Sequence, residues 1–373
     1  MIKVLIAPDS FKGTLTAGEV CDIIGEAFEN TIQDVRITKL PVADGGEGLC
    51  SCLERISGGK FKECEVSGVF GEKMTASYLM LPDNTAVIET ASCAGLPLVG
   101  DKKNPLLATT RGVGELIRIA AEDGAERILL GLGGSATNDC GACMAAALGW
   151  KFIDENGDKL NPVGMNLTRI RHIVKPDKLF DIPITAACDV DNLLYGESGA
   201  AYVFVPQKGA DENAVSLLDK GLRNIAGVIE ADLGIKVADV PGSGAAGGMG
   251  AGVIAFLGGE LKRGIDIILD IARFDEKAND ADLIITGEGR LDSQSVNGKV
   301  ISGIAKRAQS AGKKVITICG CAGDGYEEVE KLGVSETYFS CPMPKPWDEV
   351  VKDCRKDLYS AALKAAKDFS ENI

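Results

Sequence analysis

The stretch Arg127-Ile128-Leu129-Leu130-Gly131-Leu132-Gly133-Gly134-Ser135-Ala136-Thr137-Asn138-Asp139 joins an apolar run to a glycine turn and a cluster of polar side chains. The apolar run predicts a buried strand, and the Ala-rich residues 142–148 that follow predict a helix. Glycines let a ligand approach the backbone closely, and the unpaired N–H groups of a first helical turn attract anions. The stretch therefore favours an α/β fold with an anion-binding loop at a strand end. An ordinary tight strand–helix connection is the alternative.

The polar residues of this loop are candidate ligands for a phosphate or a carboxylate. Backbone N–H, hydroxyl and amide donors are available at Gly133, Gly134, Ser135, Thr137 and Asn138. Asp139 can cap the helix or hold a metal ion.

Strand–helix alternation continues toward both ends of the chain. Near the N-terminus, residues 3–7 and 35–40 predict strands, and the capping box Thr16-x-x-Glu19 predicts the helix between them. Toward the C-terminus, strands are expected at 282–286, 314–319 and 337–339, and helices at 300–309, 326–332 and 347–369. This alternation predicts a doubly wound parallel sheet.

The middle of the chain has a different pattern. Strands expected at 61–66, 74–81 and 85–88 are joined by short turns, which predicts antiparallel pairing. Helices are expected at 114–121, 211–229 and 251–257, and a further strand at 182–187. We therefore expect a Rossmann-like α/β domain formed by residues 1–68 and 275–373, with an inserted mixed-sheet α/β domain at 69–274.

The amino-acid composition limits the kinds of molecule that this protein is expected to bind. The net charge of −14 argues against nucleic acid and anionic membranes, and no run of 18 apolar residues predicts a membrane span. The N-terminal apolar run is too short for a signal peptide, so a cytoplasmic protein is expected. Twelve cysteines then indicate reduced thiols, and the lone pair Cys140-Gly-Ala-Cys143 is better explained by small buried side chains than by metal binding. Oligomeric state stays open, with a homodimer possible.

The chain has one histidine, His172, which excludes most histidine-based catalysis. Acid–base chemistry must therefore fall to Asp, Glu or Lys. Five expected strand ends carry polar and glycine clusters, at residues 9–12, 44–48, 133–139, 189–191 and 287–292. Because open α/β sheets bind ligands at the carboxyl ends of their strands, these clusters indicate an anionic substrate and a hard metal ion.

Individual residues of these clusters have candidate roles. Of Asp189 and Asp191, one carboxylate can bind a substrate hydroxyl and the other a metal ion, although two aspartates in a solvated turn have the same spacing. Lys12 and Arg290 can neutralise a carboxylate or a phosphate, or lie as ordinary surface charges. Lys299 is a weaker candidate of the same kind.

Residues 242–247 contain one G-x-G-x-x-G pattern, and the chain has no P-loop motif. The flanking residues 237–241 predict a poor strand, and no acidic residue clearly stands at the distance expected for a ribose ligand. A glycine loop that approaches a ligand through its backbone is therefore favoured over dinucleotide binding.

Six segments resemble motifs of the bacterial type I glycerate kinases. They are residues 8–15 (PDSFKGTL), 43–48 (ADGGEG), 133–139 (GGSATND), 188–192 (CDVDN), 244–248 (GAAGG) and 286–292 (TGEGRLD). The resemblance extends from Met1 to about Gly320 and departs from the family pattern at Cys140 and Cys143. It implies a two-domain α/β enzyme that phosphorylates D-glycerate with ATP and Mg²⁺, with its domains facing each other across a cleft.

This resemblance gives each candidate a hypothetical role. Glycerate would be bound by Ser10, Lys12, Asp44 and Arg290, with Lys12 and Arg290 also catalytic. Asp189 would orient or deprotonate the attacking hydroxyl, and Asp191 or Asp292 would help hold Mg²⁺. The ATP phosphates would lie on residues 133–139, with Lys299 as a helper. Two rival functions are a non-catalytic sensor of small carboxylic acids and a nicotinamide-dependent hydroxy-acid dehydrogenase.

Overall fold

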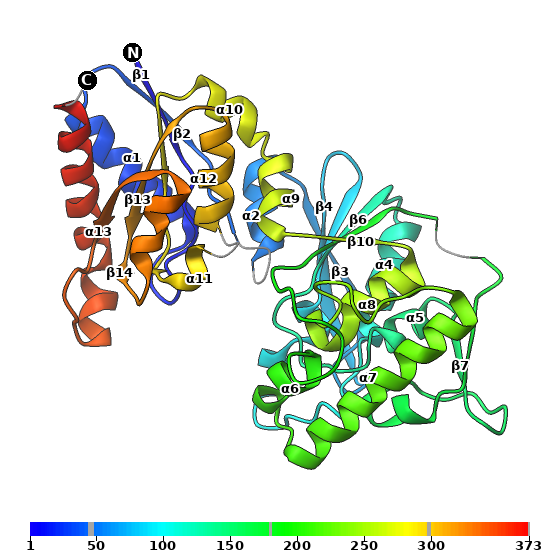
Figure 1. Cartoon of the computed structure of the whole chain (residues 1–373). Coiled ribbons are helices and arrows are strands. Elements are labelled where there is room, and N and C mark those ends of the chain that lie inside the picture. Colours follow the sequence, from blue (N-terminus) through cyan, green and yellow to red (C-terminus); the bar gives the residue numbers. More distant parts are fainter. Residues whose placement is uncertain (44–47, 179–180, 297–299, 372–373) are drawn as a thin grey trace. The chain divides into compact units, whose positions relative to one another are not determined.

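A computed structural model describes residues 1–43, 48–178, 181–296 and 300–371. The chain forms two compact units (Figure 1). Unit 1 comprises Met1–Asp44, Arg55–Ser57 and Ile265–Ile373, and unit 2 comprises Gly45–Glu54 and Gly58–Gly264.

Unit 1 contains a five-stranded parallel sheet in the order β15-β13-β11-β1-β2. The strands are β1 (Ile2–Ile6), β2 (Val35–Lys39), β11 (Leu283–Thr286), β13 (Lys314–Cys319) and β15 (Val334–Phe339), and a short parallel pair is formed by β12 (Arg290–Leu291) and β14 (Cys321–Ala322). The helices are α1 (Ala17–Thr31), α9 (Gly264–Ile271), α10 (Phe274–Asp280), α11 (Ser293–Val296), α12 (Val300–Ser310), the 3₁₀ helix η4 (Tyr326–Leu332) and α13 (Trp347–Ser370).

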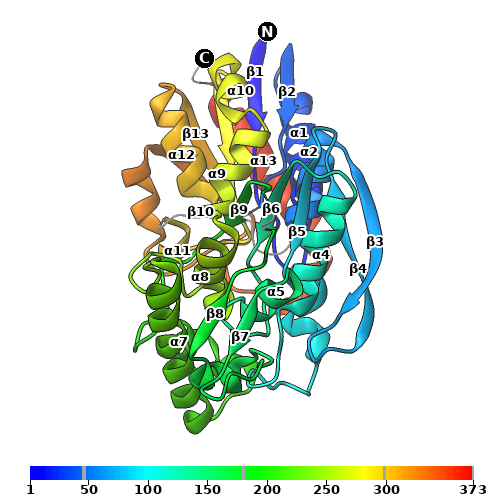
Figure 2. The same ribbon diagram turned by 90° about the vertical axis from the view of Figure 1, so that its right-hand side faces the viewer.

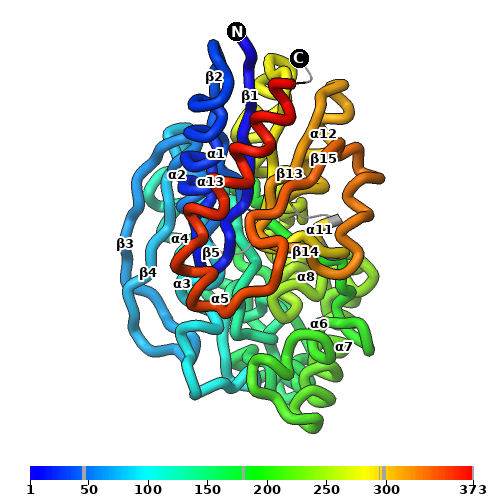
Figure 3. The backbone as a smooth tube through the Cα atoms, turned by 90° about the vertical axis from the view of Figure 1, so that its left-hand side faces the viewer, coloured from blue at the N-terminus to red at the C-terminus, as the bar shows by residue number. Residues whose placement is uncertain are grey.

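Helices cover both faces of this sheet because alternate strand residues point to opposite sides. Val4 and Ile6 belong to an apolar core shared with α1 and α13, which pack together on one face (Figure 3). Helices α10 and α12 contact the strands from the other face (Figure 1). The capping box predicted for α1 is confirmed, since Thr16 Oγ1 accepts from the Glu19 N–H at 3.3 Å and the Glu19 carboxylate accepts from the Thr16 N–H at 2.9 Å.

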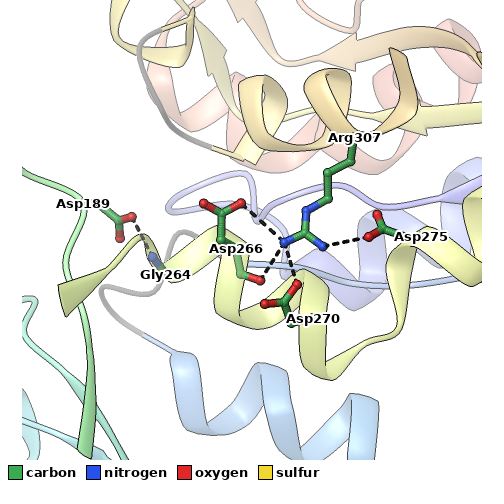
Figure 4. Close-up of polar contacts among 6 residues, drawn as sticks. All are labelled: Asp189, Gly264, Asp266, Asp270, Asp275 and Arg307. Atoms are coloured by element: carbon green, nitrogen blue, oxygen red, sulfur yellow. Dashed lines mark hydrogen bonds and ion pairs between the residues drawn. The ribbon is translucent and has the colours of Figure 1, made fainter. Parts of the chain in front are cut away.

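Arg307 ties three acidic residues of unit 1 to α12 (Figure 4). Its Nη2 lies 2.7 Å from Asp270 Oδ1 and 3.5 Å from Asp266 Oδ1, and its Nη1 lies 3.4 Å from Asp275 Oδ2. The guanidinium is mostly buried while the carboxylates are exposed. The cluster therefore fixes α9 and the start of α10 against α12.

Unit 2 contains a six-stranded mixed sheet in the order β10-β9-β6-β5-β4-β3. The strands are β3 (Lys60–Ser67), β4 (Lys73–Met80), β5 (Thr85–Glu89), β6 (Arg127–Gly131), β9 (Ile184–Ala187) and β10 (Glu260–Lys262). Strands β5, β6, β9 and β10 are parallel, whereas the long strands β3 and β4 pair antiparallel along one edge (Figure 2). The antiparallel segment expected from the sequence is confirmed.

The remaining elements of unit 2 surround that sheet. The helices are α3 (Ala91–Ala94), α4 (Arg111–Glu122), α5 (Ala142–Ala147), α6 (Ala200–Phe204), α7 (Glu212–Leu233) and α8 (Ala245–Leu257), with 3₁₀ helices η1 (Leu96–Val99), η2 (Gly164–Arg169) and η3 (Pro206–Lys208). A small hairpin is formed by β7 (Lys151–Ile153) and β8 (His172–Val174), and α2 (Leu49–Ser57) joins the two units in sequence.

The predicted α/β class with parallel sheets is confirmed, while several details differ. The unit bounds differ from the expected domain bounds because β3 pairs along its whole length with β4, which places residues 60–67 in unit 2. The helix expected at 326–332 is present and is a 3₁₀ helix. No helix in the described ranges is both long enough and apolar enough to cross a membrane.

Candidate functional site

The glycine loop of unit 2, residues 132–139, leaves the carboxyl end of β6 as predicted. Two backbone hydrogen bonds pin it to the segment after β5, from the Leu96 N–H to the Gly134 carbonyl and from the Ala136 N–H to the Ala94 carbonyl, both at 2.8 Å. Gly134 has φ +70°, a conformation that favours glycine. Of the loop, only Gly133 and Gly134 reach solvent appreciably, so a ligand would meet the loop at this turn.

The rest of the loop is buried, which its sequence does not reveal. Ser135 is 7% exposed, and Thr137, Asn138 and Asp139 are fully buried. The helix predicted at 142–148 is confirmed as α5, which has six residues and begins at Ala142. Residues 135–141 cross the interior of the unit between the glycine turn and this helix.

Asp139 has a structural role in this interior. Its Oδ2 accepts from the backbone N–H and the hydroxyl of Thr110, both at 2.9 Å, and its Oδ1 accepts from the Gly141 N–H at 3.1 Å. Burial raises the pKa of this carboxyl, while the Thr110 hydrogen bonds act in the opposite direction. These three hydrogen bonds tie the starts of α4 and α5 together.

Lys208 is the residue of this region that sequence reasoning missed. Its side chain is 3% exposed, and Nζ donates to Ser135 Oγ at 3.0 Å and to the Thr137 carbonyl at 2.8 Å. Burial lowers the pKa of Lys208 to about 7, opposed by the negative charge of Asp139. Nothing local marks this lysine as buried, since it follows a proline and a glutamine in a short surface-like segment.

Several polar atoms around the loop have no hydrogen-bond partner within the described part of the chain. They are Thr137 Oγ1, both polar side-chain atoms of Asn138, and Ser243 Oγ. All three side chains are fully buried. An unsatisfied buried polar group costs about 1–3 kcal/mol, so this cluster indicates a place for water or a polar ligand.

The glycine-rich segment 242–248 packs directly on this loop. Gly247 has φ +68°, and a Cβ there would lie 2.0 Å from the Thr137 carbonyl oxygen and 2.6 Å from Asn138 Cα. Residues 234–244 contain no strand, and Ala246 to Gly248 are all left-handed. The segment therefore lacks the strand–turn–helix context of a dinucleotide fingerprint and serves the close approach of two backbones.

Asp189 and Asp191 follow β9 as predicted, and both are exposed. Asp189 Oδ1 accepts from the Gly264 N–H at 2.9 Å (Figure 4), whereas Asp191 Oδ2 lies 3.7 Å from Arg263 Nη2. The two carboxylates thus have separate partners, and Asp191 is 79% exposed.

In unit 1, the loops that follow β1 and β11 lie side by side. The Asp9 N–H donates to the Gly287 carbonyl at 2.8 Å. Gly289 permits the approach, because a Cβ there would lie 3.1 Å from Phe11 Cα and 3.3 Å from Lys12 N. This packing brings the segments that carry Ser10, Lys12 and Arg290 to one edge of the sheet.

The second acidic candidate of unit 1, Asp292, accompanies Arg290. Arg290 is exposed, and its Nε lies 3.7 Å from Asp292 Oδ2. The pairing of β12 with β14 fixes the backbone between them. Asp44 and Lys299, the two remaining candidates, lie outside the described residues. In the part of the chain that the structure describes, no three His, Cys, Asp or Glu side chains are grouped to hold a metal ion.

Comparisons with known proteins complete this description. A model of the glycerate kinase family matches residues 4–370. The chain belongs to the glycerate kinase family. Relatives named glycerate kinase in Bacillus cereus and glycerate 2-kinase in Escherichia coli are 44% and 45% identical, and each alignment covers 98% of this chain and 97% of the relative.

A crystal structure of a Salmonella typhimurium LT2 protein assigned as glycerate kinase 2 has the same fold, with a TM-score of 0.87 and 38% identity over 100% of this chain and 99% of the other. The resemblance inferred from the six motifs is confirmed, and this member of the glycerate kinase family is an enzyme.

Proposed function

We propose that this enzyme transfers the γ-phosphoryl group of ATP to a hydroxyl of D-glycerate. The hydroxyl oxygen attacks the γ-phosphorus, the bond to the β,γ-bridging oxygen breaks, and ADP leaves. The hydroxyl proton passes to a carboxylate base or to water. Phosphoryl transfer needs mainly positioning and charge neutralisation from a protein, which strand-end loops rich in cations and glycines supply.

The observation that carries this proposal is the convergence of the Lys12 and Arg290 segments at one sheet edge of unit 1. Two cationic side chains beside Ser10 suit a small hydroxy acid, because an arginine fork and an ammonium both bind carboxylates. Ser10, Lys12 and Arg290 are the proposed glycerate ligands, together with Asp44. The names of the relatives favour glycerate over other hydroxy acids.

The remaining roles are proposed residue by residue. ATP phosphates would meet the loop at the exposed turn Gly133–Gly134, with the buried donors Ser135, Thr137 and Asn138 behind that turn and Lys299 as a helper. Asp189 would orient the attacking hydroxyl or accept its proton. Asp191 or Asp292 would help hold Mg²⁺, an ion that takes one or two carboxylate ligands from a protein and completes its shell with phosphate oxygens and water. Bound Mg²⁺ would neutralise charge on the phosphates.

The experiment is a turnover assay of the purified full chain with D-glycerate, ATP and MgCl₂. ADP formation should require both substrates and be lost with EDTA. A ³¹P NMR spectrum of the product identifies whether the 2- or the 3-hydroxyl is phosphorylated. Glycerate binding without ADP formation would instead indicate a sensor, and glycerate-dependent reduction of NAD⁺ would indicate a dehydrogenase.

A further inference from the structure

Lys208 is held in the interior by the packing of its own backbone. The residue ends η3, and the next residue, Gly209, has φ +92°. A Cβ at Gly209 would lie 2.6 Å from Lys103 Cβ, so only glycine lets the two segments meet there. The Lys103 ammonium donates to the Gln207 carbonyl at 3.1 Å. These contacts turn the Lys208 side chain inward, toward the glycine loop.

The buried ammonium binds two neutral oxygens, one on each side of Ala136. Its Nζ donates to the Ser135 hydroxyl and to the Thr137 carbonyl. Across the described residues, Lys208 has no third hydrogen-bond acceptor and no carboxylate within ion-pair distance. Asp139 is the charged group that acts on it, from the glycine loop, and its oxygens are already bound by Thr110 and Gly141. Helix α6, which packs on η3, contains no charged residue.

A cation buried without a counter-ion is costly, and it is retained in proteins where a partner or a ligand compensates it. The unsatisfied Thr137 hydroxyl and Asn138 amide in the same loop are an independent sign that the region is built to receive polar atoms. Because Ser135 accepts from Lys208, its own hydroxyl hydrogen is left to donate elsewhere. These observations together point to an anion as the kind of ligand that this region binds.

We propose that Lys208 is a positioning residue for phosphate binding, which orients Ser135 and Thr137 from beneath and supplies the positive charge of the glycine loop. This inference rests on the proposed function, since it assumes that the loop receives the phosphates of ATP. The positive charge of Lys208 acts on the anion through the loop, and a bound anion would be the counter-ion of this ammonium.

The first test compares Lys208→Met, which keeps most of the length of the side chain and removes its charge, with Lys220→Met, the same change at an exposed lysine of α7. Isothermal titration with ATP and with D-glycerate gives the affinities. Lys208→Met should weaken ATP binding by about tenfold or more and glycerate binding far less, because it removes the hydrogen bonds that hold Ser135 and Thr137 and the positive charge beneath the loop. Lys220→Met should match the wild type. Equal ATP affinities in the three proteins would overturn the proposal.

The second test uses a signature that a purely structural lysine does not have. Since burial holds the pKa of Lys208 near 7, the residue is partly neutral at pH 7.5, and an anion beside it raises that pKa. ATP binding should then take up a proton, which titrations in buffers of different ionisation enthalpy measure. The uptake should shrink in Lys208→Met, whose remaining signal comes from ATP itself. Identical uptake in both proteins would overturn the proposal.

Two further results separate a failure of this inference from a failure of the proposed function. If Lys208→Met does not fold, proton uptake by the wild type, with the uptake due to ATP's own titration subtracted, still decides the question, and its absence overturns the inference. Turnover by the wild type is measured in parallel. If the wild type turns over but ATP affinity does not depend on Lys208, the proposed function stands and Lys208 has no part in it. If the wild type neither binds ATP nor turns over, the proposed function fails. Inorganic pyrophosphate then replaces ATP as the probe, and binding that does not depend on Lys208 overturns the inference.

Discussion

The buried Lys208 also makes the stability of the folded chain depend on pH. Its pKa is near 10.5 in an unfolded chain and about 7 in the folded one. Between these values the unfolded state binds more protons, so the contribution of this group to the free energy of unfolding rises with pH and is most unfavourable below pH 7. Each pKa unit corresponds to about 1.4 kcal/mol.

Lys208→Met removes this dependence. We expect the free energy of unfolding of the wild type, minus that of the variant, to increase as pH rises from 6 to 9. Urea denaturation at several pH values measures the difference, and it cancels the titration of other groups common to both proteins. A difference that is constant with pH would show that folding does not lower the pKa of Lys208.

The proposed role of Arg290 depends on the planar shape of its side chain and not on its charge alone. Arg290→Lys keeps the charge and loses the planar fork that binds a carboxylate through two parallel hydrogen bonds. We expect KM for glycerate to rise more than KM for ATP, by about tenfold, because one charged hydrogen bond contributes about 1.5–3 kcal/mol. Steady-state kinetics with each substrate varied gives the two values. A rise for ATP alone would assign Arg290 to the phosphates.

Residues differ in how far their environment can be predicted from sequence. Ser10, Lys12 and Arg290 follow strands of one parallel sheet, and the carboxyl ends of such strands meet at one edge, so the sequence predicts that their segments lie close together. The hydrogen bond from the Asp9 N–H to the Gly287 carbonyl joins the two loops. Lys208 could not be found this way. Its burial depends on contacts with Ser135 and Thr137, more than 70 residues earlier, and periodicity carries no information about them.

Among the elements, α8 depends on glycine most strongly. Gly247→Ala would place a methyl group 2.0 Å from the Thr137 carbonyl at a left-handed position. Backbone strain alone costs about 1–2 kcal/mol, and the clash adds to it by displacing the glycine loop. We therefore expect a lower free energy of unfolding, measured by urea denaturation, together with weaker ATP binding.

The matched control is Gly227→Ala in the middle of α7, where a Cβ meets nothing within 4 Å and the backbone is helical. This change should stabilise the protein by about 0.5–1 kcal/mol, because alanine loses less conformational freedom on folding. A stabilised Gly247→Ala, or a destabilised Gly227→Ala, would contradict the packing described for these helices.

Element prediction succeeded where a local pattern decides the structure. The capping box starts α1, and alternating strands with short turns give the antiparallel β3 and β4. The helix expected at 326–332 is also present, as a 3₁₀ helix between Gly325 and Gly333, both left-handed. Prediction failed where tertiary contacts decide the structure. Strand β10 has three residues and exists only by pairing with β9, so no periodicity could reveal it.

At the scale of the whole molecule, the cysteines report on each unit separately. Eight of the twelve are buried, whereas Cys64, Cys321, Cys341 and Cys354 are partly exposed. Burial raises the pKa of Cys21 in unit 1 and of Cys93 in unit 2 to about 12, so neither is a thiolate at neutral pH.

A thiol reagent at pH 8 should therefore modify the four partly exposed cysteines within minutes and the eight buried ones only as the units open. Peptide-resolved mass spectrometry follows each site. In increasing urea, Cys21 and Cys93 should become reactive at midpoints set by their own units. Fast labelling of Cys21 in the native protein would contradict the core described for unit 1.

The sheet of unit 1 is built from strands that lie far apart in the chain, and this separation affects how the protein folds while the ribosome synthesises it. β1 lies between β2, which emerges with it, and β11, which emerges only after all of unit 2 has been made. At ordinary rates of translation, one edge of an apolar central strand therefore waits on the order of ten to fifty seconds for its partner. Unit 2 completes first, and the unpaired N–H and C=O groups on that edge of β1 stay open to pairing with other chains until the last quarter of the chain is translated.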